Sequence, residues 1–414
     1  MKFFDDPKAL LDETNLVDRF VRYAGVHTTS DGNSETCPST ERQFDLARML
    51  VDELKELGLK DAAVDDNCYV TATLPGKGDN VVGLIAHLDT SPAAPGENVE
   101  PVFHESYDGK VIELKDGIKI DPADNPKLKE CVGDTVLTSD GTTLLGADDK
   151  AGIAEIMTAL EYYQKHPDTP HPTIKVGFTP DEEIGRGHAR FPIDAFGADV
   201  AFTLDGTFDG EINIETFEAY SAWVTIKGVS THPGSGKGKL VNALRYLAKF
   251  LEKLPPKLAP EHTEDREGFI HPFEIEGDAS QCKCHLIVRD FEEEKVAKWC
   301  EIVKRAAAET GEEEPRLKVD VKCEFSYPNM AKFLKQKPEI SERLEQAVRK
   351  AGIEPNMIPI RGGTDGSNLS RKGLPTPNIF AGGMEFHGPT EWISTRSMGL
   401  ALCTVLNLMS LYAE

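Results

Sequence analysis

Three consecutive carboxylates at residues 181–183, Asp-Glu-Glu, come after an apolar run at residues 174–178, with only Thr179 and Pro180 between them. The alternating Ile, Val and Phe of this run are typical of a strand that enters a protein core. Neighbouring acids repel one another, and burial at the mouth of a strand makes their charge more costly. Bound metal ions would compensate for that charge, whereas a structural alternative is a cluster of acids that caps a helix N-terminus. The fold must therefore accommodate these acids at a metal site or at a helix cap.

Two further apolar runs also end in side chains that can bind metal. Residues 81–86 resemble a strand buried on both faces, and alternation places the following His87 and Asp89 on one side. A similar run at residues 200–204 ends in Asp205. A lone histidine after a strand is more often a core residue, but a carboxylate that orients the imidazole is typical of metal-bound histidine. Since ligands bind beyond the carboxyl ends of strands in open α/β sheets, we expect one site to collect these residues.

Another acidic pair, Asp148 and Asp149, follows the segment Leu-Leu-Gly-Ala at residues 144–147. Apolar residues at helical spacing come next, so the pair would lie at a helix N-terminus. Helix capping explains one Asp. Two acids after a glycine also suggest a backbone that approaches a ligand closely, and both explanations remain open at this point.

The charge balance limits the partners that this chain can bind. Its 46 Lys and Arg against 70 Asp and Glu leave a net charge of −24, which repels nucleic acid and anionic membranes. No apolar run is long enough to cross a bilayer, and the N-terminal residues lack the pattern of a signal peptide. The eight cysteines are scattered, as expected of reduced thiols. We therefore expect a cytoplasmic protein that binds neither nucleic acid nor membranes.

Hydrophobic patterns divide the 414 residues into a discontinuous α/β domain and an inserted domain. Residues 1–216 contain the buried strands and an amphipathic helix near residues 41–57. Residues 217–328 have the expected order strand, helix, two strands, helix and strand, which is typical of a ferredoxin-like α+β domain. Residues 329–414 return to α/β character and end in an apolar helix that begins near residue 394.

The order of the polar motifs, over nearly the whole chain, resembles that of the M20 family of dinuclear zinc peptidases. The motifs are His87-x-Asp89, Gly146-Ala-Asp-Asp-Lys-Ala-Gly, Asp181-Glu182-Glu183-Ile-Gly, Asp205, His232-Pro233-Gly234, Gly362-Gly363-Thr364-Asp365 and His387. The long insertion before residue 144 looks like that of family members that are tripeptide aminopeptidases. The resemblance implies a mixed-sheet zinc-peptidase catalytic domain, interrupted by a ferredoxin-like lid and dimerisation domain.

The resemblance also implies a set of metal ligands. His87, Asp148 and Asp205 would hold one ion, and Asp148 would bridge to a second ion held by Glu183 and His387. Histidine and carboxylate ligands suit zinc, and cobalt or manganese could substitute. Two zinc ions per subunit are therefore expected.

Two acids match catalytic residues of the family. Glu182 matches the general base, and Asp89 matches the acid behind the metal-bound histidine. Two ions lower the pKa of a shared water toward about 7. Glu183 can then serve as a ligand while Glu182 takes a proton from that water and returns it to the leaving amine.

Four residues are expected to bind substrate, three in the inserted domain and the fourth, Arg361, in the second part of the α/β domain. His232 resembles a family residue that reaches the active site from a partner subunit, although a surface histidine is the alternative. We expect Arg289, helped by Asn242 or Arg361, to bind the C-terminal carboxylate of the peptide, because a guanidinium binds a carboxylate bidentately. A surface salt bridge is the commoner role of such an arginine. The resemblance implies a homodimer formed through the inserted domain.

The predicted function is that of an aminopeptidase that releases the N-terminal residue of tripeptides. The alternatives are another M20-type hydrolase, such as a dipeptidase, carboxypeptidase or deacylase, and a metal-binding relative without catalysis. Glu182 argues against the last alternative, because a metal store needs ligands but no unligated base.

Overall fold

The computed structural model describes residues 3–413, which divide into two compact units. The sequence places the domain boundaries near residues 217 and 328 and leaves residues 359–363 in the larger domain. In the structure this short segment packs in unit 2, because the N–H of Phe217 donates to the carbonyl oxygen of Ile360 at 3.1 Å. Unit 1 contains residues 3–214, 333–358 and 364–413, and unit 2 contains residues 215–332 and 359–363.

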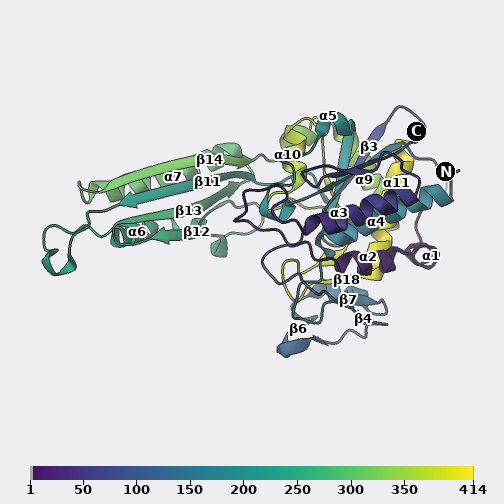
Figure 1. The fold of residues 1–414 in the computed structure, drawn as a ribbon, viewed down its shortest axis with the longest axis horizontal. Helices are drawn as coiled ribbons and strands as arrows, with labels where there is room; N and C mark the ends of the chain where they lie inside the picture. The colour runs from purple at the N-terminus through teal and green to yellow at the C-terminus, as the bar shows by residue number, and fades with distance from the viewer. Residues whose placement is uncertain (1–2, 414) are drawn as a thin grey trace. The chain divides into compact units, whose positions relative to one another are not determined.

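Unit 1 is built on a mixed eight-stranded sheet (Figure 1). In pairing order its strands are β1 (Ala63–Val64), β2 (Val70–Leu74), β8 (Thr173–Thr179), β3 (Val81–His87), β9 (Val200–Gly206), β16 (Asn378–Phe380), β10 (Glu211–Asn213) and β15 (Asn356–Met357). Strands β8, β3, β9 and β16 are parallel neighbours at its centre. Strand β2 pairs antiparallel with β8, and β10 pairs antiparallel with β16. The mixed sheet expected for this fold class is thus present.

Side-chain alternation along β3 separates the two faces of this sheet. Leu84 and Ala86 belong to the main core, whereas Ile85 packs on the other face with Phe191 and Phe196. The predicted helices near residues 41–57 and from residue 394 are found as α3 and α11. The helices of unit 1 are α1 (Pro7–Glu13), α2 (Leu16–Ala24), α3 (Gln43–Glu56), α4 (Ala147–Lys165), α5 (Ile193–Phe196), α9 (Pro338–Lys350), α10 (Asp365–Arg371) and α11 (Thr395–Tyr412). A further helix, α8 (Ala331–Leu334), spans the sequence boundary between the units.

A smaller antiparallel sheet in unit 1 joins the insertion before residue 144 to the C-terminal part of the chain. In pairing order its strands are β17 (Gly383–Met384), β18 (Trp392–Ser394), β7 (Val136–Thr138) and β4 (Val102–His104). Two short strands of the same insertion, β5 (Ile112–Glu113) and β6 (Lys119–Ile120), pair with each other. The pairing of β18 with β7 fixes the end of the loop that carries His387.

Unit 2 has the predicted ferredoxin-like order of elements. They are β11 (Glu218–Lys227), α6 (Ala243–Glu252), β12 (Phe269–Gly277), β13 (Gln281–Asp290), α7 (Glu293–Glu312) and β14 (Lys318–Tyr327). The strands form an antiparallel sheet in the order β12-β13-β11-β14. Both helices pack on one face of this sheet over Ala222, Val224 and Leu286. The alternating apolar residues of β11 and β13 therefore supply a separate core.

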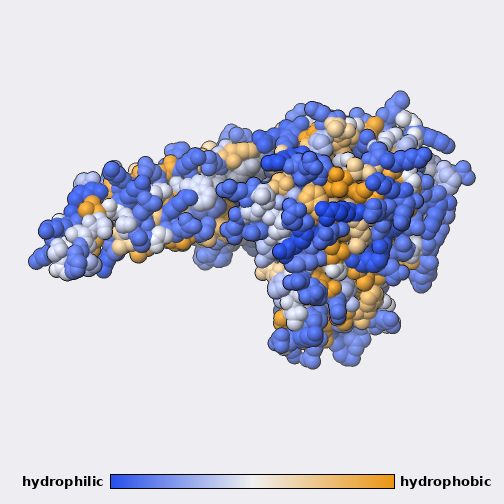
Figure 2. Space-filling view, viewed as in Figure 1, coloured by the Kyte–Doolittle hydropathy of each residue, from blue (hydrophilic) through white to orange (hydrophobic). Residues whose placement is uncertain are grey.

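Charged and polar side chains cover most of the visible surface of both units, with apolar residues scattered between them (Figure 2). None of the helices within residues 3–413 combines the length and the apolar character needed to cross a membrane.

Candidate metal centre

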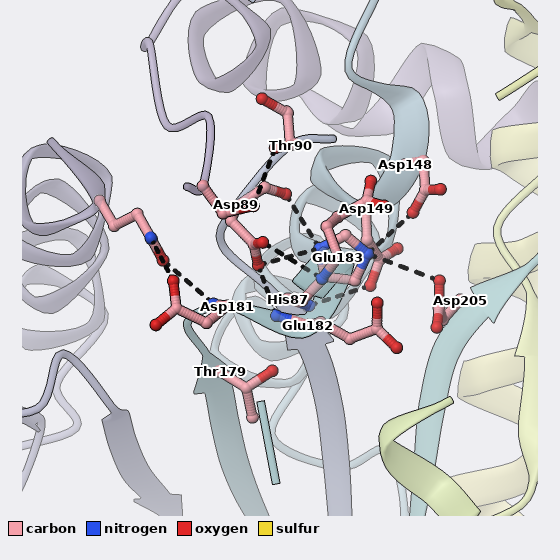
Figure 3. Close-up of polar contacts among 12 residues, drawn as sticks. His87, Asp89, Thr90, Asp148, Asp149, Thr179, Asp181, Glu182, Glu183 and Asp205 are labelled. Carbon is pink, nitrogen blue, oxygen red and sulfur yellow. Dashed lines mark hydrogen bonds and ion pairs between the residues drawn. The ribbon is translucent and has the colours of Figure 1, made fainter. Parts of the chain in front are cut away.

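The carboxyl ends of three adjacent strands, β8, β3 and β9, bring His87, Asp205 and the two glutamates together (Figure 3). His87 is the last residue of β3, and Asp205 is part of β9. Glu182 and Glu183 lie in a 3-10 turn, η3 (Glu182–Ile184), shortly after β8. Because parallel strands end at the same edge of a sheet, residues far apart in the sequence meet here.

Asp148 lies between two histidines. Its Oδ1 is 2.8 Å from Nε2 of His87, and its Oδ2 is 3.1 Å from Nε2 of His387. Nε2 of His387 is also 2.9 Å from Oε2 of Glu183. Nε2 of His87 is 3.6 Å from Oδ1 of Asp205. The five predicted metal ligands therefore form one continuous cluster, with one Asp148 oxygen directed at each histidine.

The atoms of this cluster suit divalent metal ions. Potential ligand atoms lie within 4.8 Å of one another in two groups, one of His87, Asp149 and Asp205 and one of His87, Asp148 and Glu183. Oε1 of Glu183 and Oδ1 of Asp149 are buried without a hydrogen-bond partner among residues 3–413. Buried carboxylate oxygens are normally paired, so these two are available to an ion. Imidazole and carboxylate together fit zinc, and also cobalt or manganese.

The two neighbouring acids Asp148 and Asp149, joined by a cis peptide bond, have different environments. Oδ2 of Asp149 accepts a hydrogen bond from the backbone N–H of His87 at 3.1 Å, which leaves one oxygen for an ion. Asp148 directs both oxygens at imidazole nitrogens. This geometry favours Asp148 as the carboxylate shared by two ions. Asp149 belongs to the first group of potential ligands, with His87 and Asp205, and the sequence does not predict this position.

Asp89 connects the end of β3 to the turn that carries the two glutamates. Its carboxylate is fully buried and accepts the backbone N–H groups of Glu182 at 2.9 Å and Glu183 at 3.2 Å. Nδ1 of His87 is 2.9 Å from the carbonyl oxygen of Asp89 and 3.6 Å from its carboxylate. Asp89 therefore orients the histidine mainly through its backbone and the glutamates through its side chain.

Asp181, the first acid of the triple, serves the fold and lies outside both ligand groups in the described part of the chain. Its side chain is completely buried and accepts hydrogen bonds from the backbone N–H of Ser39 at 2.7 Å and from Nε2 of Gln43 at 2.7 Å. The turn is thereby tied to α3. Only two of the three acids therefore face the cluster. Hydrogen bonds from Ser39 and Gln43, and not a metal ion, compensate for the burial of Asp181.

Replacing Asp181 by Asn is expected to lower the free energy of unfolding by about 1–3 kcal/mol, because one amide group would direct N–H donors at the donors of Ser39 and Gln43. The amount of metal bound at saturating zinc should not change. Urea denaturation of the metal-free protein, with metal analysis of the loaded protein, measures both quantities. Loss of metal at unchanged stability would contradict this assignment.

Burial and neighbouring charges shift the proton affinities of the cluster. Burial, with the charge of Asp205, raises the pKa of Glu182 well above its ordinary value, and burial raises the pKa of Glu183 to about 7. Hydrogen bonds to Asp148 and Glu183 raise the pKa of His387 to about 10. Without a cation the cluster therefore retains protons, and metal binding must release them.

Three buried groups near the cluster escape the sequence predictions. Lys150 is fully buried and donates to the carbonyl oxygen of Val26 at 2.6 Å, and burial lowers its pKa to about 7. Oδ2 of Asp365 accepts a hydrogen bond from Oγ1 of Thr179 at 2.8 Å. Lys150 and Asp365 belong to motifs that are visible in the sequence, and their polar side chains within those motifs could have identified them as site residues. The third, Glu391, lies four residues after His387 and has no pattern of its own.

Two of the predicted substrate-binding residues, His232 and Asn242, make local contacts in unit 2. His232 is exposed, and its Nδ1 accepts a hydrogen bond from the backbone N–H of Gly234 at 3.1 Å. Oδ1 of Asn242 accepts the backbone N–H of Arg245 at 3.4 Å and caps α6. These contacts explain both residues structurally, and they leave the imidazole of His232 accessible.

The two predicted carboxylate-binding arginines, Arg289 and Arg361, also lie in unit 2. Nη1 of Arg361 donates to the carbonyl oxygens of Asp265 at 2.9 Å and Glu267 at 2.7 Å. Nη1 of Arg289 donates to the carbonyl oxygen of Tyr220 at 2.8 Å. The hydrogen bonds of the Arg289 guanidinium to residues 3–413 all involve Nη1, which also donates to the carbonyl oxygen of Val288 at 2.9 Å, whereas those of Arg361 involve both Nη1 and Nη2. Arg289 is therefore the better candidate for binding an anion.

Comparison with known proteins identifies the family of this chain. The family described as Peptidase family M20/M25/M40 matches residues 140–410. The chain belongs to the M20 peptidase family. Relatives named Peptidase T from Geobacillus kaustophilus and Shouchella clausii are 46% identical over 404 residues and 48% identical over 402 residues. Each alignment covers 96% of this chain and 98% of the relative.

Solved structures of several peptidases have the same fold. The aminopeptidase PepT from Bacillus cereus aligns with a TM-score of 0.74 at 23% identity, covering 97% of this chain and 98% of that chain. A tripeptidase from Staphylococcus aureus aligns with a TM-score of 0.77 at 21% identity, covering 96% and 98%. A dinuclear metal-binding M20 peptidase from Bacillus subtilis aligns with a TM-score of 0.65 at 14% identity, covering 98% and 99%. These comparisons confirm the predicted fold class, and the family match confirms a peptidase-type hydrolase.

Proposed function

We propose that this protein is an aminopeptidase that uses two zinc ions to release the N-terminal residue of tripeptides. The observation that carries the proposal is the position of Asp148, whose two oxygens face His87 and His387 at 2.8 and 3.1 Å. Asp205 and Glu183 would complete the two ligand sets. The names of the Peptidase T relatives and of the tripeptidase with the same fold support the choice of substrate.

The side chains around the cluster can divide the work of peptide hydrolysis. Two bound ions would lower the pKa of a shared water toward about 7 and polarise the peptide carbonyl. Glu183 faces His387 at 2.9 Å, so it can serve as a ligand while the adjacent Glu182 moves protons. Glu182 would take the proton of the attacking water and return it to the leaving amine. Asp89, through its bonds to both backbone N–H groups, keeps the two glutamates in these positions.

Substrate length separates this proposal from the other hydrolases that share the scaffold. We would compare kcat/KM for di-, tri- and tetrapeptides of one composition with an N-acetylated tripeptide as the control. The expected result is highest activity on the free tripeptide and release of its first residue. Preference for dipeptides, release of the last residue or cleavage of the acetylated peptide would instead indicate a dipeptidase, a carboxypeptidase or a deacylase.

Replacing Arg289 by Ala is expected to raise KM for a tripeptide by about 10–100-fold, since a hydrogen-bonded charge pair contributes about 1.5–3 kcal/mol. The carboxylate of a tripeptide lies roughly 7 Å beyond the scissile carbonyl, so a fixed cation there would measure substrate length. Kinetics on a tripeptide and on its C-terminal amide test this role. The exposed Arg305 of α7 provides a matched control variant, Arg305→Ala.

Two outcomes would remove Arg289 from the proposal. Wild-type protein that cleaves the acid and the amide equally well would show that no cation binds the terminal carboxylate. An Arg289→Ala variant that still strongly prefers the free acid would assign that role to another residue, such as Arg361 or Asn242. The homodimer through the inserted domain, with His232 acting on the partner's substrate, stays a prediction of the family resemblance.

A further inference from the structure

Glu391 is a buried carboxylate that accepts three backbone N–H groups at the start of α4. Its Oε2 accepts from Leu145 at 2.8 Å and from Gly146 at 2.9 Å, and its Oε1 accepts from Asp148 at 3.1 Å. The residue is 1% exposed. The N-cap residue Gly146 has no side chain to cap the helix, so an acceptor from 243 to 246 positions away satisfies these donors.

The same residue ends the loop that carries His387. The backbone N–H of Glu391 donates to the carbonyl oxygen of Gly388 at 3.2 Å, which closes a turn directly after His387. The next residue, Trp392, begins β18 and pairs with β7. Glu391 is therefore fixed on one side to the sheet and on the other to the backbone of Asp148.

This arrangement connects two candidate ligands that are distant in the sequence. Oδ2 of Asp148 lies 3.1 Å from Nε2 of His387. Glu391 accepts the backbone N–H of Asp148 and donates its own N–H to Gly388, the residue after His387. Metal ligands must stay within about 0.2 Å of their required distances, so the backbone that carries them has to be fixed. His387 has a positive φ of 65°, a conformation that needs support from its surroundings.

We propose that Glu391 is a positioning residue that sets the separation of Asp148 and His387 for the second metal ion. The inference rests on the proposed dinuclear centre and adds a residue that acts on it without being a ligand. Partners that orient metal ligands typically contribute 10–100-fold to metal affinity. A residue that only stabilised the fold would change the affinity of both ions or of neither.

The Glu391→Gln variant tests this role because it keeps the size of the side chain. Gln has one acceptor oxygen, so its amide nitrogen would face at least one of the three N–H donors. We expect the second Co²⁺ ion, which would have both Asp148 and His387 as ligands, to bind about 10–100-fold more weakly, and the first, which would share only Asp148, to lose much less affinity. Titration of the metal-free protein with Co²⁺, followed by visible absorption, reports the coordination of each ion independently of activity. Glu391→Asp keeps two acceptor oxygens and should recover part of the affinity.

A matched control is available in unit 2. Glu218 is also 1% exposed, and its Oε2 accepts the backbone N–H of Asn329 at 2.8 Å. Glu218→Gln should lower the unfolding temperature without changing either Co²⁺ affinity. Wild-type affinity for both ions in Glu391→Gln, or an equal loss for both ions, would overturn the inference. Wild-type protein that binds fewer than two ions would refute the proposed dinuclear centre, and the role of Glu391 with it.

Discussion

Replacing Glu182 by Gln is expected to leave the bound metal unchanged and to lower kcat on a tripeptide by about 10²-fold or more. The amide has the size of the carboxylate but cannot take a proton from the attacking water. Within residues 3–413, the two groups of potential ligands include Glu183 but not Glu182. Since proton transfer matters in the transition state, KM should change much less than kcat.

The adjacent residue provides the control for this experiment. Glu183→Gln makes the same chemical change one position away, and it should reduce metal content because Oε2 of Glu183 faces His387 at 2.9 Å. Metal analysis and kinetics on the same preparations separate the two effects. If Glu182→Gln loses metal in proportion to activity, Glu182 is a ligand and the division of roles between the two glutamates is wrong.

Replacing Asp148 by Asn is expected to have the largest effect on metal binding. Its two oxygens face two histidines, so a single change would weaken both ligand sets. We expect metal content to fall from two ions to fewer than one per chain and activity to fall by more than about 10²-fold. Metal analysis after removal of excess ions, followed by kinetics at saturating zinc, measures both quantities.

Two further variants show whether the loss is specific to a bridging role. His387→Ala should lose only the second ion, since His387 contacts Asp148 and Glu183 but lies outside the group of His87, Asp149 and Asp205. Asp149→Asn should retain more metal than Asp148→Asn, because one oxygen of Asp149 is used by the backbone of His87. A reversed order of the two Asp variants would make Asp149 the shared ligand.

The apolar strands made much of the site predictable from the sequence. Strands β3, β8 and β9 are long, buried runs, and the residues after each run had to meet at one edge of a parallel sheet. The ferredoxin-like order of unit 2 was equally visible, because its strands alternate clearly over about ten residues each. His387 follows no such run, and it entered the prediction only through the family resemblance.

Other parts of the site depend on contacts that leave no local pattern. Glu391 acts on residues 243 to 246 positions away, and no periodicity precedes it. The strands β4, β7, β17 and β18 are two or three residues long, which is too short for an alternating pattern to identify them. Asp181 looked like its two neighbours, but its left-handed backbone turns its side chain toward Ser39 and Gln43.

The most direct test of the proposed centre is a zinc titration of the metal-free protein, with bound metal and tripeptide hydrolysis measured in the same samples. We predict no hydrolysis without metal, activity that rises with occupancy, and saturation at two ions per chain with release of the N-terminal residue. Full activity in protein stripped of metal, or full occupancy of the cluster without any peptide hydrolysis, would contradict the assignment of these residues to a dinuclear peptidase centre.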